Sequence, residues 1–349
     1  MEKQKHSLVR IYGFAVGVSL LLLIFVGLKQ GIEALTTVTI LAGLEITFSF
    51  DNAVVNARIL QKMSRAWQAI FMTLGIFIAV FVVRVLLPIF IVSLTSSTGF
   101  NEIVRLVLHD PEVYAHKLEI AQPMIATFGG IFLLMIFLDF VFEHRTINWL
   151  KKFEDALYKI GKIQNMSITL GIAALFVTAV LFVPNYEQVK VLFAGLAGLM
   201  TYLVVNALDG LVAGNKQLTT DTSSTSTFKA GLVGFLYLEL IDASFSLDGV
   251  VGAFAITKSI LLIAVGLGIG ALFVRSMTVH MLRRGVLNKY IYLEHGAHYA
   301  IGILALVMLY SVKTHVPNFI TGGAGLLVII AAIIHSHLES QNQPVSQAQ

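Results

Sequence analysis

The chain has 349 residues, of which 57% are hydrophobic and only 13% are charged, and its net charge is +4. A soluble domain usually carries about 25% charged residues, so this composition, with a mean hydropathy of +0.83, excludes an ordinary soluble protein and predicts an all-α polytopic membrane protein. Nucleic-acid binding is not expected, because the basic residues lie in short loops, where they orient membrane spans. The absence of cysteine excludes disulfide bonds and thiolate metal ligands.

Ten apolar segments follow one another along the chain, each close to or above the roughly 20 residues that a helix needs to cross a bilayer. They predict a single membrane domain over residues 1–349. The expected transmembrane helices lie at 8–28, 32–57, 66–95, 120–143, 166–184, 188–212, 230–256, 260–282, 294–312 and 318–336.

Basic residues mark every second connection between these spans. They gather at the N-terminus and in the loops after the second, fourth, sixth and eighth spans, whereas the opposite loops carry few. If every span crosses once, all the basic ends lie on one side of the membrane. The positive-inside rule then places both termini in the cytoplasm.

The connections differ in character. Residues 97–119 are mixed polar and are expected outside the cell, and residues 144–165 place large apolar side chains at helical spacing, which predicts a short amphipathic helix at the membrane interface. The Ser- and Thr-rich segment 214–229 is predicted to be a mobile linker, and the polar tail 339–349 to be disordered.

One polar phrase, acid-x-x-Phe-Ser-x-Asp, occurs twice within this apolar chain. The first copy runs from Glu45 to Asp51 in the second span, and the second copy runs from Asp242 to Asp248 in the seventh span. These two spans run in opposite directions, as five helices followed by five helices require. The pattern predicts a 5+5 inverted repeat, with halves at 6–184 and 186–338 and a shared site near the bilayer midplane.

The two copies bring carboxylates to membrane depth, where charges are costly and usually functional. Such acids must be partly protonated, paired with arginine, or neutralised by a divalent cation, so exchange of a metal ion for protons is a natural mechanism. Oxygen ligands suit Mn²⁺, Ca²⁺ and Mg²⁺ better than Zn²⁺ or copper. The candidate metal ligands are Glu45, Ser49, Asp51, Asn52, Glu239, Asp242, Ser246 and Asp248.

The aspartates that close each copy do not share the face of the other ligands. On a straight helix Glu45, Ser49 and Asn52 form one stripe, whereas Asp51 lies about 100° away from it. Either Asp51 and Asp248 form a second edge of the site, or the helix unwinds at the Ser-x-Asp step and frees carbonyl oxygens for an ion.

Four further charges lie inside predicted spans. Arg84 and Arg275 stand in similar phrases of the third and eighth spans, and they either pair with the carboxylates or extend to the membrane surface. Asp139 and Asp209 lie near the cytoplasmic ends of their spans. Each is either a hydrogen-bond partner between helices or part of an inner vestibule.

Polar groups also stand where the fourth and ninth spans are expected to begin. Glu119 and Glu294 are expected to stabilise these helix starts, because the helix dipole favours an acid there. His295 and His298 follow at i, i+3 spacing. A role as metal ligands is the less favoured interpretation of these two histidines.

The first copy, the second copy and the segment Tyr292–His298 resemble the TerC integral membrane family, most closely its branch labelled as a domain of unknown function. The family takes its name from tellurium resistance. The resemblance spans residues 30–315 and implies export of Mn²⁺ or related divalent cations from the cytoplasm. It also implies ion-binding roles for Glu45, Asp51, Asn52, Asp242 and Asp248.

The second copy departs from the commoner family pattern. That pattern has Asp-Ser followed by proline, whereas here Gly249 follows Asp248, and Glu239 is an added acid. The departure leaves the identity of the ion and its coupling open.

We therefore expect a secondary transporter in a bacterial inner membrane, with Mn²⁺ as the first cargo, Ca²⁺ or Mg²⁺ as other cargoes and protons as counter-ion. No permanent cofactor, nucleic acid or enzymatic activity is expected, the partners being lipid and the cation. One alternative is a non-transporting membrane subunit of a metal- or tellurium-stress complex; another is an intramembrane aspartyl protease with an Asp51–Asp248 dyad. The chain lacks G-x-x-x-x-G-K-[ST], so an ATP-driven pump is not expected.

Overall fold

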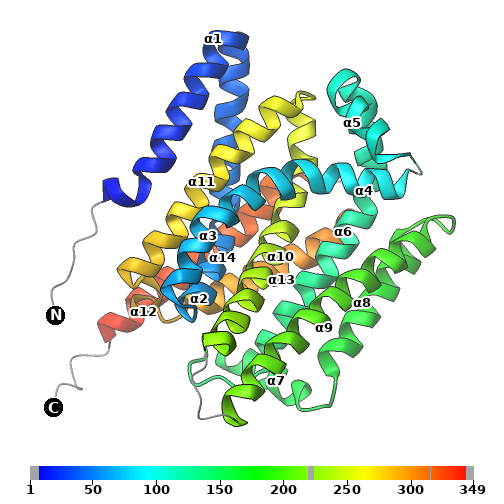
Figure 1. Ribbon diagram of the computed structural model, residues 1–349. Coiled ribbons are helices and arrows are strands. Elements are labelled where there is room, and N and C mark those ends of the chain that lie inside the picture. The colour runs from blue at the N-terminus through cyan, green and yellow to red at the C-terminus, as the bar shows by residue number, and fades with distance from the viewer. Residues whose placement is uncertain (1–7, 97, 219–223, 315, 343–349) are drawn as a thin grey trace.

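The computed structural model describes residues 8–96, 98–218, 224–314 and 316–342, with their side chains except at 209–218, 224–230, 247–248, 318–319, 321 and 340–342. Every regular element within these ranges is a helix, which confirms the predicted all-α class (Figure 1). The helices are α1 (Leu8–Phe48), α2 (Phe50–Gln61), α3 (Arg65–Phe77), the π-helix η1 (Ile78–Leu86), α4 (Leu87–Thr95), α5 (Phe100–His109), α6 (Pro111–Phe142), α7 (Lys151–Gly161), α8 (Met166–Phe182), α9 (Gln188–Leu218), α10 (Ser224–Ile256), α11 (Ile260–Arg284), α12 (Val286–Lys289), α13 (Leu293–Ser311) and α14 (Asn318–Asn342).

All ten predicted spans fall on helices, and the apolar helices identify an integral membrane protein. Among the described residues, seven helical stretches are long and apolar enough to cross a bilayer, or eight if the bent pair α7 and α8 counts as one span. The motif-bearing α10 is not among these seven stretches. The count of ten crossings and the cytoplasmic position of both termini therefore stay predictions.

The first predicted boundary, between 28 and 32, appears as a break within α1. Gly31 has φ 85° and ψ −175°, so the helical ladder is interrupted there and the chain turns back on itself (Figure 1). Glycine reaches this positive φ without the steric cost that a Cβ would bring. The two arms of α1, residues 8–30 and 32–48, thus correspond to the first two predicted spans.

The segment 97–119, expected outside the cell, is largely helical, and its side of the membrane stays a prediction. It contains α5, and α6 begins at Pro111 rather than near 120. Proline at the first helical position fits a helix start, because its missing N–H would be unpaired there anyway. Glu119 consequently lies inside α6, where it is exposed 4.0 Å from His116, and the predicted capping role is wrong.

The remaining connections agree in part with the sequence. The predicted amphipathic helix is confirmed as α7, which is bent by 95° from α8. Most of the predicted linker 214–229 is helical, since α9 ends at Leu218 and α10 begins at Ser224; residues 219–223 lie outside the described residues. Likewise α14 continues to Asn342, and residues 343–349 of the predicted disordered tail lie outside the described residues.

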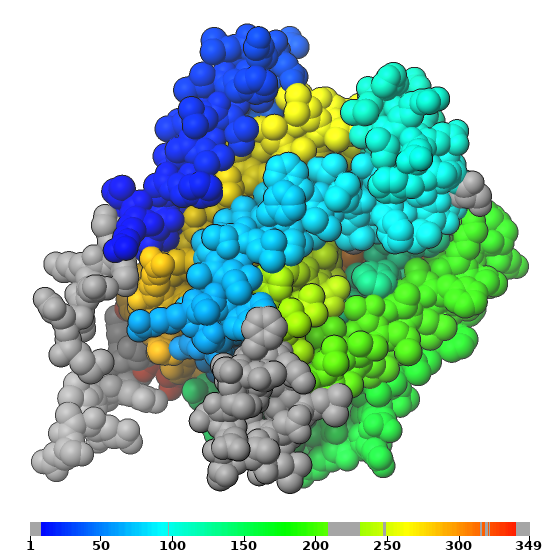
Figure 2. Space-filling model, in the orientation of Figure 1, coloured from blue at the N-terminus to red at the C-terminus, as the bar shows by residue number. Residues whose placement is uncertain are grey.

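α6 and α13 pack against each other at the centre, with α9 against α6 and α14 against α13. At one flank the second arm of α1 packs on α11, and at the other flank lie α8 and α9 (Figures 1 and 2). Both flanks expose large apolar side chains, for example Phe14 and Phe193, at 69% and 70%. Such a surface fits lipid rather than water.

Glycine at position 198 sets how closely α9 approaches α6. A Cβ there would lie 2.3 Å from the backbone oxygen of Phe128, which cannot swing aside as a side chain can. We expect Gly198→Ala to destabilise the fold by about 1–3 kcal/mol, as overpacking does. The matched change Gly43→Ala meets open space and should be neutral or stabilise by up to about 1 kcal/mol. Thermal unfolding in detergent compares the two, and equal melting temperatures would contradict the close helix contact.

Candidate functional site

The two copies of the repeated phrase meet inside the bundle. The side-chain amide of Asn52, on α2, donates a hydrogen bond to Oδ1 of Asp242, on α10, at 2.6 Å. Both residues are buried, and 190 positions separate them in the chain. The structure therefore brings the two predicted halves of the site together.

Glu45, at the end of the second arm of α1, is held by a buried arginine. Its Oε1 lies 2.5 Å from Nη2 of Arg84 and accepts a hydrogen bond from Ser49 at 3.2 Å. The other guanidinium nitrogen, Nη1, donates to the backbone oxygen of Ala79 within η1 at 2.7 Å. Gly270 makes room for the acid, since a Cβ there would lie 2.3 Å from Cγ of Glu45.

A second buried arginine holds the acids of α10. Nη2 of Arg275 lies 3.1 Å from Glu239 and 3.5 Å from Asp242. Its guanidinium also lies over the ring of Phe71, at 3.7 Å from the centroid, and donates to the Phe71 backbone oxygen. Gly75 leaves the space for this group, because a Cβ there would lie 2.5 Å from Nη1.

The two arginines thus occupy matching places. Arg84 pairs with Glu45 and Arg275 contacts Asp242, and these acids stand at the same position of the repeated phrase. Both arginine side chains are nearly fully buried. Of the two alternatives, they pair with carboxylates and do not extend to the membrane surface.

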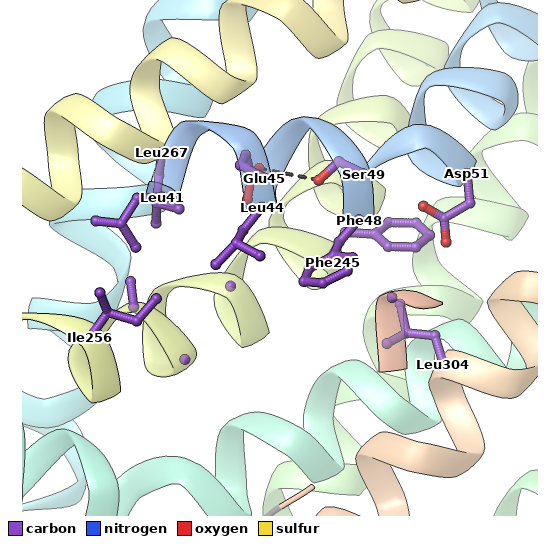
Figure 3. Close-up of a pocket in the computed structure, with 14 residues that line it drawn as sticks. Leu41, Leu44, Glu45, Phe48, Ser49, Asp51, Phe245, Ile256, Leu267 and Leu304 are labelled. Carbon is purple, nitrogen blue, oxygen red and sulfur yellow. Dashed lines mark hydrogen bonds between the residues drawn. The ribbon is translucent and has the colours of Figure 1, made fainter. Parts of the chain in front are cut away.

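Asp51 differs from the other buried acids. It is only 7% exposed and accepts a hydrogen bond from the Asn52 backbone N–H at 2.8 Å, but no arginine or lysine among the described residues pairs with it. Glu45, Ser49 and Asp51 line a cavity of about 70 Å³ together with Phe245 and Gly249 of α10. Figure 3 shows the three polar residues and Phe245 around it. This volume exceeds the roughly 10–15 Å³ that a water molecule requires.

Several neutral oxygens near this site lack protein partners. Asn52 Oδ1, Asn56 Oδ1 and Ser246 Oγ are buried and have no hydrogen-bond partner among the described residues. Buried polar atoms are usually satisfied, so each of these oxygens is available to accept from water or to contact a cation. Among the described residues, no group of three His, Asp or Glu side chains is close enough together to hold a metal ion by itself. A metal ion at this site would therefore also need the neutral oxygens.

The backbone behaves differently in the two copies. In the first copy, Ser49 separates α1 from α2, with φ −98° and ψ 19°, so the helix is interrupted at the predicted Ser-x-Asp step. In the second copy α10 is continuous through Ser246 and Gly249. Unwinding therefore occurs at one copy only, and the side chain of Asp248 lies outside the described residues.

The buried charges do not balance. Within the described part of the site, Glu45, Asp51, Glu239 and Asp242 supply four negative charges if all are ionised. The two arginines, 84 and 275, supply two positive charges, so two negative charges remain. One divalent cation or two protons would neutralise the site.

Asp139, another predicted residue, pairs with a tyrosine on a different helix. The hydroxyl of Tyr202 donates a hydrogen bond to Asp139, which joins α9 to α6, so Asp139 is a hydrogen-bond partner between helices. The side chain of Asp209, like that of Asp248, lies outside the described residues. The protease alternative depends on Asp248 and therefore stays a prediction.

The structure also shows partners that the sequence did not indicate. His298 stacks on Phe140 at 3.7 Å, and His295 lies 3.7 Å from the buried Glu154. Glu154 accepts from the Tyr299 hydroxyl at 2.6 Å and thereby fastens α7 to α13. Leu150, Phe153 and Ile160 of the predicted apolar side are 47%, 50% and 39% exposed, so the buried side of α7 is the one that carries Glu154. Nothing in the sequence connects this buried acid to α13.

Residues 50–343 match the family described as "Protein of unknown function (DUF475)", and the chain belongs to this family. The match includes Asp51, Asn52 and the whole second copy of the phrase. Neither the curated proteins nor the solved structures gave a match.

Glu45 and Arg84 should contribute to the free energy of unfolding as a coupled pair and not independently. Glu45→Gln leaves a buried guanidinium without its counter-charge and should cost about 3–5 kcal/mol. Adding Arg84→Met to Glu45→Gln should restore much of this loss, because no charge is then left unpaired. Unfolding of both single variants and the double variant gives the coupling. Glu143→Gln changes an acid whose side chain is 68% exposed, so it is the matched control and should have little effect. Additive losses would show that the two groups act independently.

Proposed function

We propose that this member of the DUF475 family is a secondary transporter that moves divalent cations, Mn²⁺ first, out of the cytoplasm across a bacterial inner membrane. One observation carries the proposal: Asp51 is a buried carboxylate with no cationic partner among the described residues, and together with Glu45 and Ser49 it lines a cavity large enough for water. Intramembrane acids of this kind usually mark ion or proton paths.

The charge and chemistry of the site support a divalent cargo. The two uncompensated negative charges counted in the described part of the site match one divalent ion, and the available ligands there are carboxylate, amide and hydroxyl oxygens. These are the ligands that Mn²⁺, Mg²⁺ and Ca²⁺ prefer. When the cation leaves, two protons balance the same charges, so proton exchange is the coupling that we propose.

We further propose that the chain is a 5+5 inverted repeat related to the TerC family. The matched acid–arginine contacts support this: Arg84 with Glu45 and Arg275 with Asp242, each pair joining a motif helix to the span that follows it. In such repeats, rocking of one half against the other exposes a midplane site to either side.

Asp51→Asn should abolish most cation flux without unfolding the protein. The change removes the unpaired charge, so stability should hold or rise, while the site loses compensation for a dehydrated divalent ion. In proteoliposomes loaded with a metal-sensitive dye, we expect Mn²⁺ flux to fall at least about tenfold. Asp155→Asn on exposed α7 is the matched control and should keep normal flux.

Near-normal flux in a well-folded Asp51→Asn protein would refute the proposed site. Absence of Mn²⁺, Ca²⁺ and Mg²⁺ flux in the unmodified protein would instead favour the alternative of a non-transporting membrane subunit.

Cation binding should also be visible as stabilisation. A ligand that binds only the folded state at about 100 times its Kd stabilises it by about 2.7 kcal/mol, so saturating Mn²⁺ should raise the melting temperature in detergent. The rise should shrink as the pH falls, because protons compete with the metal for the same carboxylates. Asp51→Asn should reduce the rise as well. Stabilisation by Zn²⁺ alone would contradict an oxygen-ligand site.

A further inference from the structure

Helix α7 has an apolar side that the described protein does not cover. Phe153 and Ile160 are 50% and 39% exposed, and Ile163, just beyond the end of the helix, is 58% exposed. Phe153 and Ile160 are seven residues apart, so they lie within about 20° of each other around the helix axis. Exposed apolar side chains gathered on one side of a helix indicate contact with a membrane or a partner.

The turn into α8 places α7 at the edge of the bilayer. α8 has 17 residues, which extend over about 25 Å, and it exposes apolar side chains such as Phe176 and Val180, at 55% and 61%. α7 is bent by 95° from α8. The turn contains Asn165 in the left-handed region, with φ 58°, a conformation that asparagine tolerates. A membrane crossed by α8, as the sequence predicts, therefore has α7 along its surface.

A buried acid fixes how α7 is rotated about its own axis. Glu154 accepts hydrogen bonds from the backbone N–H groups of Trp149 and Leu150, at 3.2 and 3.0 Å. It also accepts one from the Tyr299 hydroxyl at 2.6 Å. The first two bonds stabilise the start of α7, where backbone N–H groups lack helical partners, and the third holds that start against α13. The side that carries Glu154 therefore faces the protein, and the other sides of α7 face the surroundings.

Lysines occupy one of these outward sides. Four lysines of α7 and its C-terminal cap are exposed: Lys151, Lys152, Lys159 and Lys162. Counted at 100° per residue, all four lie about 60–160° from Glu154 in one direction, whereas Phe153 and Ile160 lie about 100–120° from it in the other. None of the four lysines forms an ion pair among the described residues. Asp155 also lies on their side, so four lysines and one aspartate give it a net charge of +3.

The arrangement of these charges favours one occupant. Membrane orientation alone requires basic residues on the cytoplasmic side, but not their alignment on one side of a helix beside an apolar side. Such alignment is typical of helices that lie in the surface of an anionic membrane. The hydrocarbon interior does not fit, because four lysines are costly there. A second copy of this chain fits less well, because a two-fold contact would bring two sides of charge +3 together.

We propose that α7 binds anionic phospholipids at the membrane surface where α8 begins. Phe153 and Ile160 enter the boundary between headgroups and acyl chains, and the four lysines contact the lipid phosphates. Lysine side chains can reach these phosphates while their apolar stems stay along the lipid surface. This proposal concerns the lipid and does not depend on whether the chain transports an ion.

The cysteine-free sequence allows a label at a single position. Ile160→Cys carries a bimane fluorophore on the apolar side of α7, and the full-length protein is placed in phosphatidylcholine nanodiscs. Part of the lipid is replaced by phosphatidylglycerol with a spin label on its acyl chain or, in a second sample, by phosphatidylcholine with the same label. The quenching constant should be at least about threefold larger with phosphatidylglycerol in about 0.1 M salt.

Removing the lysines should remove this preference. With Lys151→Gln, Lys152→Gln, Lys159→Gln and Lys162→Gln combined, the two lipids should quench equally, and salt at about 1 M should have the same effect by screening. The matched control combines the same change at four exposed lysines elsewhere, Lys29, Lys190, Lys258 and Lys313, and should keep the preference. A label at Phe176→Cys, in the middle of α8, should be quenched by both lipids alike.

The outcomes decide the proposal. Equal quenching by the two lipids at Ile160→Cys would overturn the binding of anionic lipid. Absence of quenching by either lipid there, with normal quenching at Phe176→Cys, would also overturn it, because protein such as a second copy would then cover this side. A preference that survives the four-lysine change would overturn the role of the lysines. Loss of the preference with that change, at an unaltered melting temperature, supports the proposal.

Discussion

Two arginines buried in an apolar bundle determine what lies around them. A guanidinium does not lose its proton in proteins, so each arginine needs a carboxylate wherever the bundle places it. Arg84 takes Glu45, and Arg275 shares Glu239 and Asp242. These contacts fasten the second arm of α1 to η1 and α10 to α11. In the described part of the site, Asp51 is left without a cationic partner.

The strengths of the ion pairs divide the molecule into a rigid centre and a separable edge. Breaking a buried pair by removing one partner costs about 3–5 kcal/mol, whereas a solvent-exposed pair contributes about 0–1 kcal/mol. The central pairs belong to the first class, and the partly exposed contacts of Glu294 with Arg58 and Arg145 belong to the second. The proposed transport needs both kinds, because the candidate ligands must keep their geometry while the contacts around them change.

The sequence was sufficient for features that depend on local pattern. Apolar runs predicted the helical spans, and the repeated phrase predicted that Asn52 and Asp242 would lie close together. It could not predict which acid each arginine takes, because Glu45 and Arg84 meet only through tertiary packing. The start of α6 was also missed, since polar residues between Pro111 and Glu119 hid a helix that continues beyond the apolar run.

The helix interruption at Ser49 is another feature that the sequence alone could not predict. Both copies of the phrase read Phe-Ser-x-Asp, yet only the first copy is interrupted. The ring of Phe48 lies against Gly322 of α14, where a Cβ would come within 2.3 Å of it. This contact with α14 is made by the first copy, and the residues of the repeated phrase do not predict it.

The third span contains the π-helix η1, and η1 carries the buried Arg84 of the site. Arg84 lies near the end of η1, whose wide turns hold more residues than the 3.6 of each α-helical turn. Deleting one residue from this stretch would let an ordinary α-helix form, and because a π-turn takes up about one residue more than an α-turn, the helix after it would largely keep its rotation about the axis. Arg84 would then still face Glu45 from a regular helix, whereas the same deletion in α3 or α4 would turn everything after it by about 100°. A homologue with one residue fewer between these two positions is therefore expected to lack the π-helix rather than the ion pair.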